Sequence, residues 1–295
     1  MAAIFEGAGV AIVTPFDAQG QIDFDAYGRL IDFQLQNGTD AIIACGTTGE
    51  PSTMTAQERE SVIAYAIERV AGRVPVIAST GGNNTAEVIR ASQAAQLAGA
   101  DGLLIVTPYY NKATQNGLVA HYTAVADAVN LPIIVYNVPS RTGLNMAPET
   151  LCKLSYHPRI AGMKEASGNI AQVSEMIRLC GERLAVYSGE DGIVVPLMAL
   201  GGKGVISVVS NILPRQTHDM AAAMLRGDYE TARALQFQLA PVISLLFSEV
   251  NPIPVKAALS MMGLCENHLR LPLTPMEAAH QQALQAEMRA LGLQV

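Results

Sequence analysis

Residues 102–137, with the sequence GLLIVTPYYNKATQNGLVAHYTAVADAVNLPIIVYN, contain one complete structural unit of this chain. The two ends of the stretch, Gly102–Val106 and Ile133–Asn137, are short and almost continuously apolar, which is typical of strands covered on both faces. Between them, Gly117–Val129 carries apolar residues at helical spacing. A strand, a helix and a second strand in this order predict a parallel βαβ unit.

The same alternation continues along most of the chain. Six more strand-like runs occur at Gly9–Val13, Ala41–Ala44, Val74–Ser79, Ile160–Lys164, Ala185–Ser188 and Gly204–Val208. An open doubly wound sheet shows the same alternation, so the number of strands has to decide between the two folds. Because eight strands close a barrel, the eight units predict an α/β protein with a (β/α)8 TIM barrel.

Helical patterns separate these strands, and Thr55–Val70 is the most complete of them. Thr55 is followed three residues later by Glu58, which is the pattern of a capping box. After the eighth unit, which ends near Arg226, no strand signal remains. We therefore expect a barrel domain over residues 1–226 and a helical C-terminal domain over residues 227–295. The other expected helices are Thr85–Ala98, Pro148–Leu154, Ile170–Cys180, Tyr229–Phe247, Ile253–Met262 and Pro275–Leu291.

The composition excludes several classes of protein. Half of the 295 residues are apolar and 15% are charged, which excludes a disordered chain. The net charge is −7 and no basic run occurs, so nucleic acid is not an expected partner. No apolar stretch approaches the roughly 20 residues that cross a bilayer, so no membrane association is expected. Met1–Gly9 lacks the basic flank of a secretory signal, and we therefore expect a cytoplasmic protein.

Neither a nucleotide cofactor nor a metal ion is expected. No Gly-x-Gly-x-x-Gly motif follows the first strand, and no Walker loop occurs. The four cysteines and five histidines are scattered, without the short spacings of a zinc site. In a cytosolic protein these cysteines are expected to be reduced and mostly buried.

Lys164 is the strongest candidate for a catalytic group. In barrels of this kind the active site lies where the strands end and the βα loops begin. Only Lys164, among the lysines of the chain, falls at the inner end of a predicted strand. Loss of water there lowers the pKa of the amine, which frees it to attack a carbonyl group. The alternative is a lysine paired with a nearby carboxylate, and Tyr136 at the end of the preceding strand favours the catalytic interpretation.

Three further strand ends carry polar residues. The turn Gly46–Glu50 offers backbone N–H groups that suit a carboxylate or phosphate, although an ordinary glycine-rich turn has the same composition. Tyr109 and Tyr110 follow the fourth strand and are expected to point in opposite directions, with aromatic packing as the alternative role. Arg141 follows the fifth strand and is suited to clamp a carboxylate, although a surface arginine is usually only solvated.

Together these segments resemble those of the dihydrodipicolinate synthase family, a class I aldolase type within the pyruvate-dependent barrel superfamily. The segments are Gly46–Glu50, Thr107–Asn111, Tyr136–Gly143, Lys164–Gly168, Gly201–Ser207 and Asn251–Lys256. They occur in this order, and the resemblance covers essentially the whole chain. Tyr136 with Lys164 alone would indicate only the superfamily. The resemblance implies condensation of pyruvate with L-aspartate 4-semialdehyde in the diaminopimelate route to L-lysine.

The resemblance also implies catalytic roles. Lys164 forms a Schiff base, or imine, with pyruvate, and Tyr136 shuttles protons during imine formation and aldol addition. Thr48 links Tyr136 to Tyr110 in a hydroxyl relay, and Tyr110 comes from the adjacent subunit. No metal or dissociable cofactor is implied, because the protonated imine itself acts as the electron sink.

Other residues are implied to contact the substrates. Groups around Thr47 and Thr48, both counted among the catalytic residues, bind the pyruvate carboxylate. The Ile206 carbonyl and Gly189 lie close to the imine, and Arg141 holds the semialdehyde carboxylate at the mouth. The resemblance implies a homotetramer assembled as a dimer of dimers, while the residues themselves leave dimer and tetramer open.

Two other interpretations start from the same residues. N-acetylneuraminate lyases and 2-keto-3-deoxy sugar-acid aldolases share the lysine and the tyrosine, and split a longer 2-keto acid into pyruvate and an aldehyde. Arg141, together with Thr47, Thr48 and Tyr110, favours a short carboxylated aldehyde over a sugar. A catalytically silent barrel, used for binding or as a scaffold, would have lost the lysine or the tyrosine, and this chain has both.

Feedback inhibition by L-lysine is where the chain departs from the family pattern. The positions that match the interface site of lysine-inhibited relatives are Pro51, Ser52, Ala56, Asn83, Glu87 and Tyr109. Asn83, Glu87 and Tyr109 fit the pattern, whereas one type of inhibited relative has histidines where this chain has Ala56 and Arg59. A cation at Arg59 disfavours the ammonium of lysine, so we expect weak or absent inhibition. The alternative is that Arg59 points to solvent and the other positions suffice.

Overall fold

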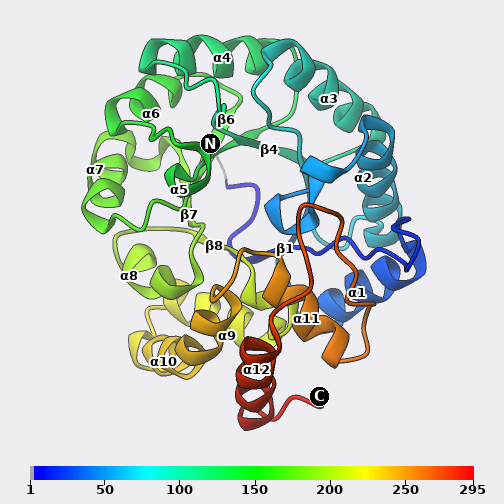
Figure 1. Cartoon of the computed structure of the whole chain (residues 1–295). Coiled ribbons are helices and arrows are strands. Elements are labelled where there is room, and N and C mark those ends of the chain that lie inside the picture. The colour runs from blue at the N-terminus through cyan, green and yellow to red at the C-terminus, as the bar shows by residue number, and fades with distance from the viewer. Residues whose placement is uncertain (1–2) are drawn as a thin grey trace.

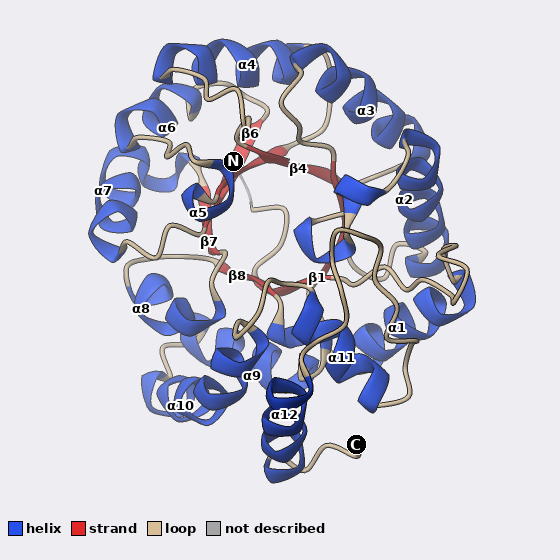
Figure 2. Ribbon diagram, in the orientation of Figure 1, coloured by secondary structure: helices blue, strands red, loops and turns tan. Residues whose placement is uncertain are grey.

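The structure, a computed structural model, describes residues 3–295 and has a closed ring of eight parallel strands at its centre (Figure 2). The strands are β1 (Gly7–Ala11), β2 (Ala41–Ala44), β3 (Val76–Ser79), β4 (Gly102–Val106), β5 (Ile133–Asn137), β6 (Ile160–Glu165), β7 (Ala185–Ser188) and β8 (Gly204–Ser207). Each strand pairs with the next along the chain, and β8 pairs with β1. The predicted (β/α)8 barrel is therefore confirmed.

Helices surround the ring on its outside (Figure 1). They are α1 (Phe24–Gln36), α2 (Ala56–Val70), α3 (Thr85–Ala98), α4 (Gln115–Asp127), α6 (Pro148–Leu154), α7 (Ile170–Cys180), α8 (Val194–Ala199) and α9 (Pro214–Leu225). The one-turn helix α5 (Pro139–Thr142) lies inside this ring of helices, directly after β5. Helix α2 begins with the predicted capping box, in which the Thr55 hydroxyl accepts from the Glu58 N–H and the Glu58 carboxylate accepts from the Thr55 N–H.

Strand β1 lies two residues earlier than the predicted Gly9–Val13. At its start Gly7 pairs with Gly204 of β8, and the two backbones approach so closely that a Cβ on Gly204 would lie 1.9 Å from the Gly7 carbonyl oxygen. At its end the chain leaves the ladder, because the Val13 N–H donates to the Asn211 side chain instead of to a strand. Apolar character alone does not mark either of these ends.

Successive side chains of each strand point alternately into the barrel and toward the surrounding helices, so the core has two parts. In β5, Ile134 and Tyr136 point into the barrel, whereas Ile133 and Val135 pack against the surrounding helices. Phe5 closes the amino end of the barrel, where its ring stacks on Tyr187 with 4.5 Å between the ring centroids. Because this end is filled with apolar side chains, open space and polar groups are left at the carboxyl ends of the strands.

Three helices follow the barrel: α10 (Tyr229–Leu246), α11 (Ile253–Met261) and α12 (Ala278–Ala290), as the sequence predicts. Helix α10 packs on α8, α9 and α12, and α11 packs on α12. The division into two domains after residue 226 stays a prediction. None of the helices within residues 3–295 has the length and apolar character needed to cross a membrane. In the N-terminal segment Met1–Gly9, Met1 and Ala2 lie outside the described residues.

Candidate active site

A cavity of about 580 Å³ opens at the carboxyl ends of the strands. Its wall includes residues from the turn after β2, from the ends of β5 and β6, and from the loops after β7 and β8. Helix α10 and Asn251 from the C-terminal segment complete it. The predicted residues that line it are Thr47, Thr48, Tyr136, Arg141, Lys164 and Gly189.

Lys164 and Tyr136 are brought together by strand register. They are direct partners in the β5–β6 ladder, so both side chains point into the barrel. The Lys164 Nζ lies 4.4 Å from the centroid of the Tyr136 ring, and both side chains are buried. A phenol beside a buried amine is the arrangement needed to move protons during attack on a carbonyl group.

Burial lowers the pKa of Lys164 to about 8. The buried carboxylate of Asp191 opposes this shift, and the Arg141 guanidinium adds to it. With a pKa near 8, about a tenth of the amine is neutral at pH 7, compared with well under a thousandth for an ordinary lysine. Lys164 is thus prepared to act as a nucleophile.

The hydroxyl that faces the Tyr136 phenol belongs to Thr47. Burial raises the pKa of Tyr136, while its hydrogen-bonding contact with the Thr47 side chain lowers it. The Thr48 hydroxyl accepts a hydrogen bond from Asn251 Nδ2 at 3.0 Å. These contacts favour Thr47 over Thr48 as the neighbour of the Tyr136 phenol, and the relay through Thr48 stays a prediction.

The other predicted residues occupy different positions around the cavity. Gly189 packs against Lys164, where an added Cβ would lie 3.1 Å from the lysine Cε. Arg141 lies at the exposed mouth and donates through Nη2 to the Asn251 carbonyl at 3.1 Å. Ile206 is buried in the barrel interior and is not among the described residues that line the cavity. Tyr110 is 89% exposed and does not line the cavity of its own chain.

Comparison with known proteins identifies the family of this chain. The sequence model of the dihydrodipicolinate synthetase family matches residues 4–291. The chain belongs to this family. A 4-hydroxy-tetrahydrodipicolinate synthase from Lachnoclostridium phytofermentans is 56% identical over 292 residues, which are 99% of both chains.

Solved structures of the dihydrodipicolinate synthase family also match over nearly the whole chain. The enzyme from Aquifex aeolicus is 46% identical, with a TM-score of 0.97 over 99% of both chains. A chloride-inhibited dihydrodipicolinate synthase from Acinetobacter baumannii, solved in complex with pyruvate, is 42% identical, with a TM-score of 0.96 over 98% of this chain and 99% of that chain.

Sequence reasoning gave no role to two buried carboxylates near Lys164 in this dihydrodipicolinate synthase family member. Asp191 follows β7, and its Oδ2 accepts from the Val208 and Val209 N–H groups at 3.0 and 2.9 Å. Glu165 is the residue after Lys164, and its carboxylate accepts from Asn137 Nδ2 at 3.0 Å. Asp191 acts on Lys164, whose pKa it raises, whereas Glu165 points to the opposite face of β6 from its neighbour Lys164.

A second cavity, of about 290 Å³, lies on the other side of Tyr136. Pro51, Ser52, Arg59 and Tyr109 line it, and it shares Thr47, Tyr136 and Arg141 with the catalytic cavity. Four positions of the predicted lysine site therefore lie in the same cavity wall as Tyr136. Arg59 is half-buried and lines this space, which favours the interpretation in which its charge faces the predicted lysine site over the one in which it points to solvent.

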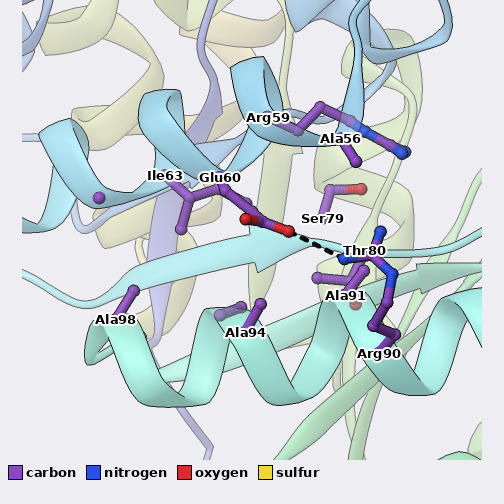
Figure 3. A pocket seen from close by; sticks show the side chains of 12 residues that line it. Ala56, Arg59, Glu60, Ile63, Ser79, Thr80, Arg90, Ala91, Ala94 and Ala98 are labelled. Atoms are coloured by element: carbon purple, nitrogen blue, oxygen red, sulfur yellow. Dashed lines mark hydrogen bonds and ion pairs between the residues drawn. The ribbon is translucent and has the colours of Figure 1, made fainter.

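A third cavity, of about 210 Å³, lies between α2 and α3, away from Lys164 (Figure 3). Ala56 and Arg59 lie at one end of it, and an ion pair between Arg90 and Glu60 spans it at 3.0 Å. Glu87 is paired with the same Arg90. Asn83 is elsewhere and donates to the Tyr109 carbonyl at 3.2 Å. The other three positions of the predicted lysine site do not line the second cavity; they are Ala56, Asn83 and Glu87.

Proposed function

We propose that this chain is a 4-hydroxy-tetrahydrodipicolinate synthase, a lyase of class I aldolase type that condenses pyruvate with L-aspartate 4-semialdehyde in the diaminopimelate route to L-lysine. The observation that carries the proposal is the register of Tyr136 and Lys164, which places a buried amine of lowered pKa beside a phenol. Full-length relatives of this name and activity support it.

The first half of the reaction builds the nucleophile. The neutral Lys164 amine attacks the ketone carbon of pyruvate, and loss of water from the carbinolamine leaves a protonated imine. Tyr136 delivers the proton that the departing hydroxyl needs, with Thr47 as its hydrogen-bonding neighbour. The imine then withdraws electrons from the methyl group, which gives a proton to the Tyr136 phenolate and becomes an enamine, so the phenol is restored.

The second half forms the carbon–carbon bond. The enamine carbon attacks the aldehyde carbon of the semialdehyde, and Tyr136 protonates the new alkoxide. The amino group of the semialdehyde then displaces Lys164 from the imine carbon, which closes the ring and frees the enzyme. Since the covalent imine is the electron sink, this route uses no dissociable cofactor and no metal. The substrates and the route are those of cytoplasmic metabolism, and we place the protein in the cytoplasm.

Two assays test this proposal directly. One measures turnover of pyruvate with L-aspartate 4-semialdehyde, and the other measures cleavage of N-acetylneuraminate. Rapid pyruvate-dependent consumption of the semialdehyde, with no release of pyruvate from N-acetylneuraminate, is the expected result. The reverse pattern would assign the chain to the sugar-acid lyases. Failure of borohydride to trap pyruvate on the protein would exclude both enzymes and leave a binding or scaffold role.

Replacement of Arg141 by alanine is expected to raise the KM for the semialdehyde about 10–100-fold, because a charge-assisted hydrogen bond to its carboxylate is lost. The KM for pyruvate should change much less. Steady-state kinetics measures both values. The assays are run at a pH above the pKa of Lys164, because at that pH the amine is already neutral and the influence of Arg141 on its pKa matters least. Arg141→Lys is the matched control and should recover part of the loss. Equal effects on both substrates would instead assign Arg141 to holding Asn251.

We further propose a homotetramer built as a dimer of dimers, with Tyr110 acting in the site of the neighbouring subunit. Tyr109 and Tyr110 are exposed in the loop after β4, which suits one interface. Leu200, Tyr229 and Phe237 are exposed at the end of α8 and on α10, which suits a second one. Two separate apolar surfaces are what a dimer of dimers needs.

L-Lysine is expected to inhibit weakly or not at all. The Arg59 guanidinium faces the cavity and has no ion-pair partner among residues 3–295, and Glu87 is already paired with Arg90. The cavity therefore offers a cation where the ammonium of lysine needs an anion. Turnover measured against rising L-lysine checks this, with Arg59→Gln as the comparison that removes the charge. Strong inhibition at sub-millimolar lysine would show that Asn83, Glu87 and Tyr109 suffice.

A further inference from the structure

A completely buried ion pair lies behind the catalytic turn. Lys256 Nζ donates to Glu50 Oε1 at 2.5 Å, and the two side chains are 0% and 1% exposed. Lys256 belongs to α11, outside the barrel, whereas Glu50 ends the turn Thr47–Gly49 after β2. A buried ion pair is weak evidence for stability, because desolvation offsets its attraction. Its position next to the site therefore needs another explanation.

Glu50 is held in an unusual backbone conformation. Its φ is +55°, in the left-handed region that residues with a Cβ rarely adopt. This conformation reverses the chain between the Thr47–Gly49 turn and the next short turn, Pro51–Thr53. The surrounding contacts have to enforce it, and the carboxylate of Glu50 is the group they hold.

Arg270, also from the C-terminal region, contacts the same carboxylate through its backbone and the following turn through its guanidinium. The Arg270 backbone N–H lies 3.3 Å from Glu50 Oε2, and its guanidinium donates to the Thr53 carbonyl at 2.9 Å and pairs with Glu58. Both cations pack on the Phe16 ring, with Lys256 Nζ and Arg270 Cζ each 4.3 Å from its centroid. Two cations and two carboxylates thus balance each other around one turn.

The same region reaches the turn from the cavity side. Asn251 Nδ2 donates to the Thr48 hydroxyl, and the Asn251 carbonyl accepts from Arg141. In Figure 1 the orange chain after α11 passes over the short blue turns that follow β2, in agreement with the Arg270 contacts. The Thr47–Glu50 turn is therefore held by C-terminal residues on both sides.

We propose that Lys256, through its ion pair with Glu50, is a positioning residue that fixes the Thr47–Thr48 turn for the carboxylate of pyruvate. The inference rests on the proposed function, in which this turn takes that carboxylate. It assigns the C-terminal helices a part in substrate capture, although Lys256 itself touches no substrate. Loss of the pair should weaken pyruvate binding and leave the chemistry of Lys164 largely intact.

The test is the double variant Glu50→Gln/Lys256→Met, which removes both charges and leaves no buried charge unpaired. The pyruvate concentration that half-saturates borohydride trapping is expected to rise about tenfold, because a small displacement of binding groups has effects of this size or larger. Turnover per trapped site at saturating pyruvate should fall at most about tenfold, far less than in Thr47→Val, because Thr47 moves with the turn but keeps its hydroxyl. The KM for the semialdehyde should stay within about twofold, because Arg141 keeps its place.

The matched control is Glu6→Gln/Lys203→Met. It makes the same substitutions in an exposed lysine–glutamate pair, 3.2 Å apart, at the amino ends of β1 and β8. All three quantities should equal those of the parent protein. Any loss caused by these substitutions in general would appear in both double variants.

An unchanged half-saturating pyruvate concentration in the Glu50/Lys256 variant would overturn the inference, since a purely structural pair lowers only the amount of active protein. If that variant does not fold, Glu50→Gln decides alone. This variant keeps an acceptor for Lys256 and must still raise the half-saturating concentration, and an unchanged value overturns the inference. Because trapping needs no second substrate, a parent protein that fails to trap pyruvate contradicts the proposed function instead.

Discussion

Replacement of Lys164 by alanine is expected to abolish trapping of pyruvate by borohydride and to lower turnover by several orders of magnitude, because the covalent route is lost. Lys164 is the nucleophile in this interpretation because it is buried, lies over the Tyr136 ring and has a pKa of about 8. Mass spectrometry of the protein after reduction measures the adduct. The fold should remain, since loss of a buried cation relieves desolvation.

The matched control for this experiment is Lys153→Ala, on the exposed side of α6. It should keep full trapping and full turnover, because Lys153 is exposed and does not line the cavity. An adduct that persists in Lys164→Ala would identify another lysine as the nucleophile. The only other fully buried candidate among the described residues is Lys256, whose amine is occupied by Glu50.

The same assignment predicts how capture of pyruvate depends on pH. Only the neutral amine attacks, so the rate of imine formation should rise with pH through the pKa of about 8 and level off above it. Asp191 holds this pKa up and burial brings it down. Trapping with cyanoborohydride at a series of pH values gives the profile. A rate that keeps rising toward the pKa of an ordinary lysine would contradict the burial of Lys164.

The barrel could be predicted from the sequence because its signal is local and repeated. Each strand, such as β4, is a short apolar run, and its number in the chain equals its place in the ring. Lys164 was also predictable, since one polar residue at the end of an apolar run, IAGMK, stands out by type and place. Both predictions depend on neighbouring residues and on strand periodicity alone.

Contacts between distant parts of the chain could not be predicted in this way. Lys256 and Glu50 are 206 positions apart, and Asn251 and Thr48 are 203 apart. On its helix Lys256 looks like an ordinary surface lysine, and only tertiary packing shows that it is buried. The choice between Thr47 and Thr48 depends on the direction of each side chain in a tight turn. Adjacent residues of one type carry no sequence signal for that difference.

Tyr136→Phe is expected to lower turnover about 10²–10⁴-fold, the usual contribution of a general acid or base. The ring stays, so packing against Lys164 stays, and only the hydroxyl that moves protons is lost. The effect should fall on the turnover number more than on the KM for either substrate. Steady-state kinetics together with the rate of borohydride trapping measures it, since imine formation itself needs the phenol.

Two threonine variants decide which hydroxyl works with Tyr136. Thr47→Val should approach the loss seen in Tyr136→Phe, because the Thr47 side chain is the hydrogen-bonding neighbour of the phenol. Thr48→Val should cost less, because it removes only the hydrogen bond from Asn251. Valine keeps the shape of threonine, so a difference between two adjacent positions reports on the hydroxyl alone. A larger loss in Thr48→Val would restore the relay through Thr48. Equal losses in both variants would mean that the turn acts as one unit, with neither hydroxyl dedicated to the phenol.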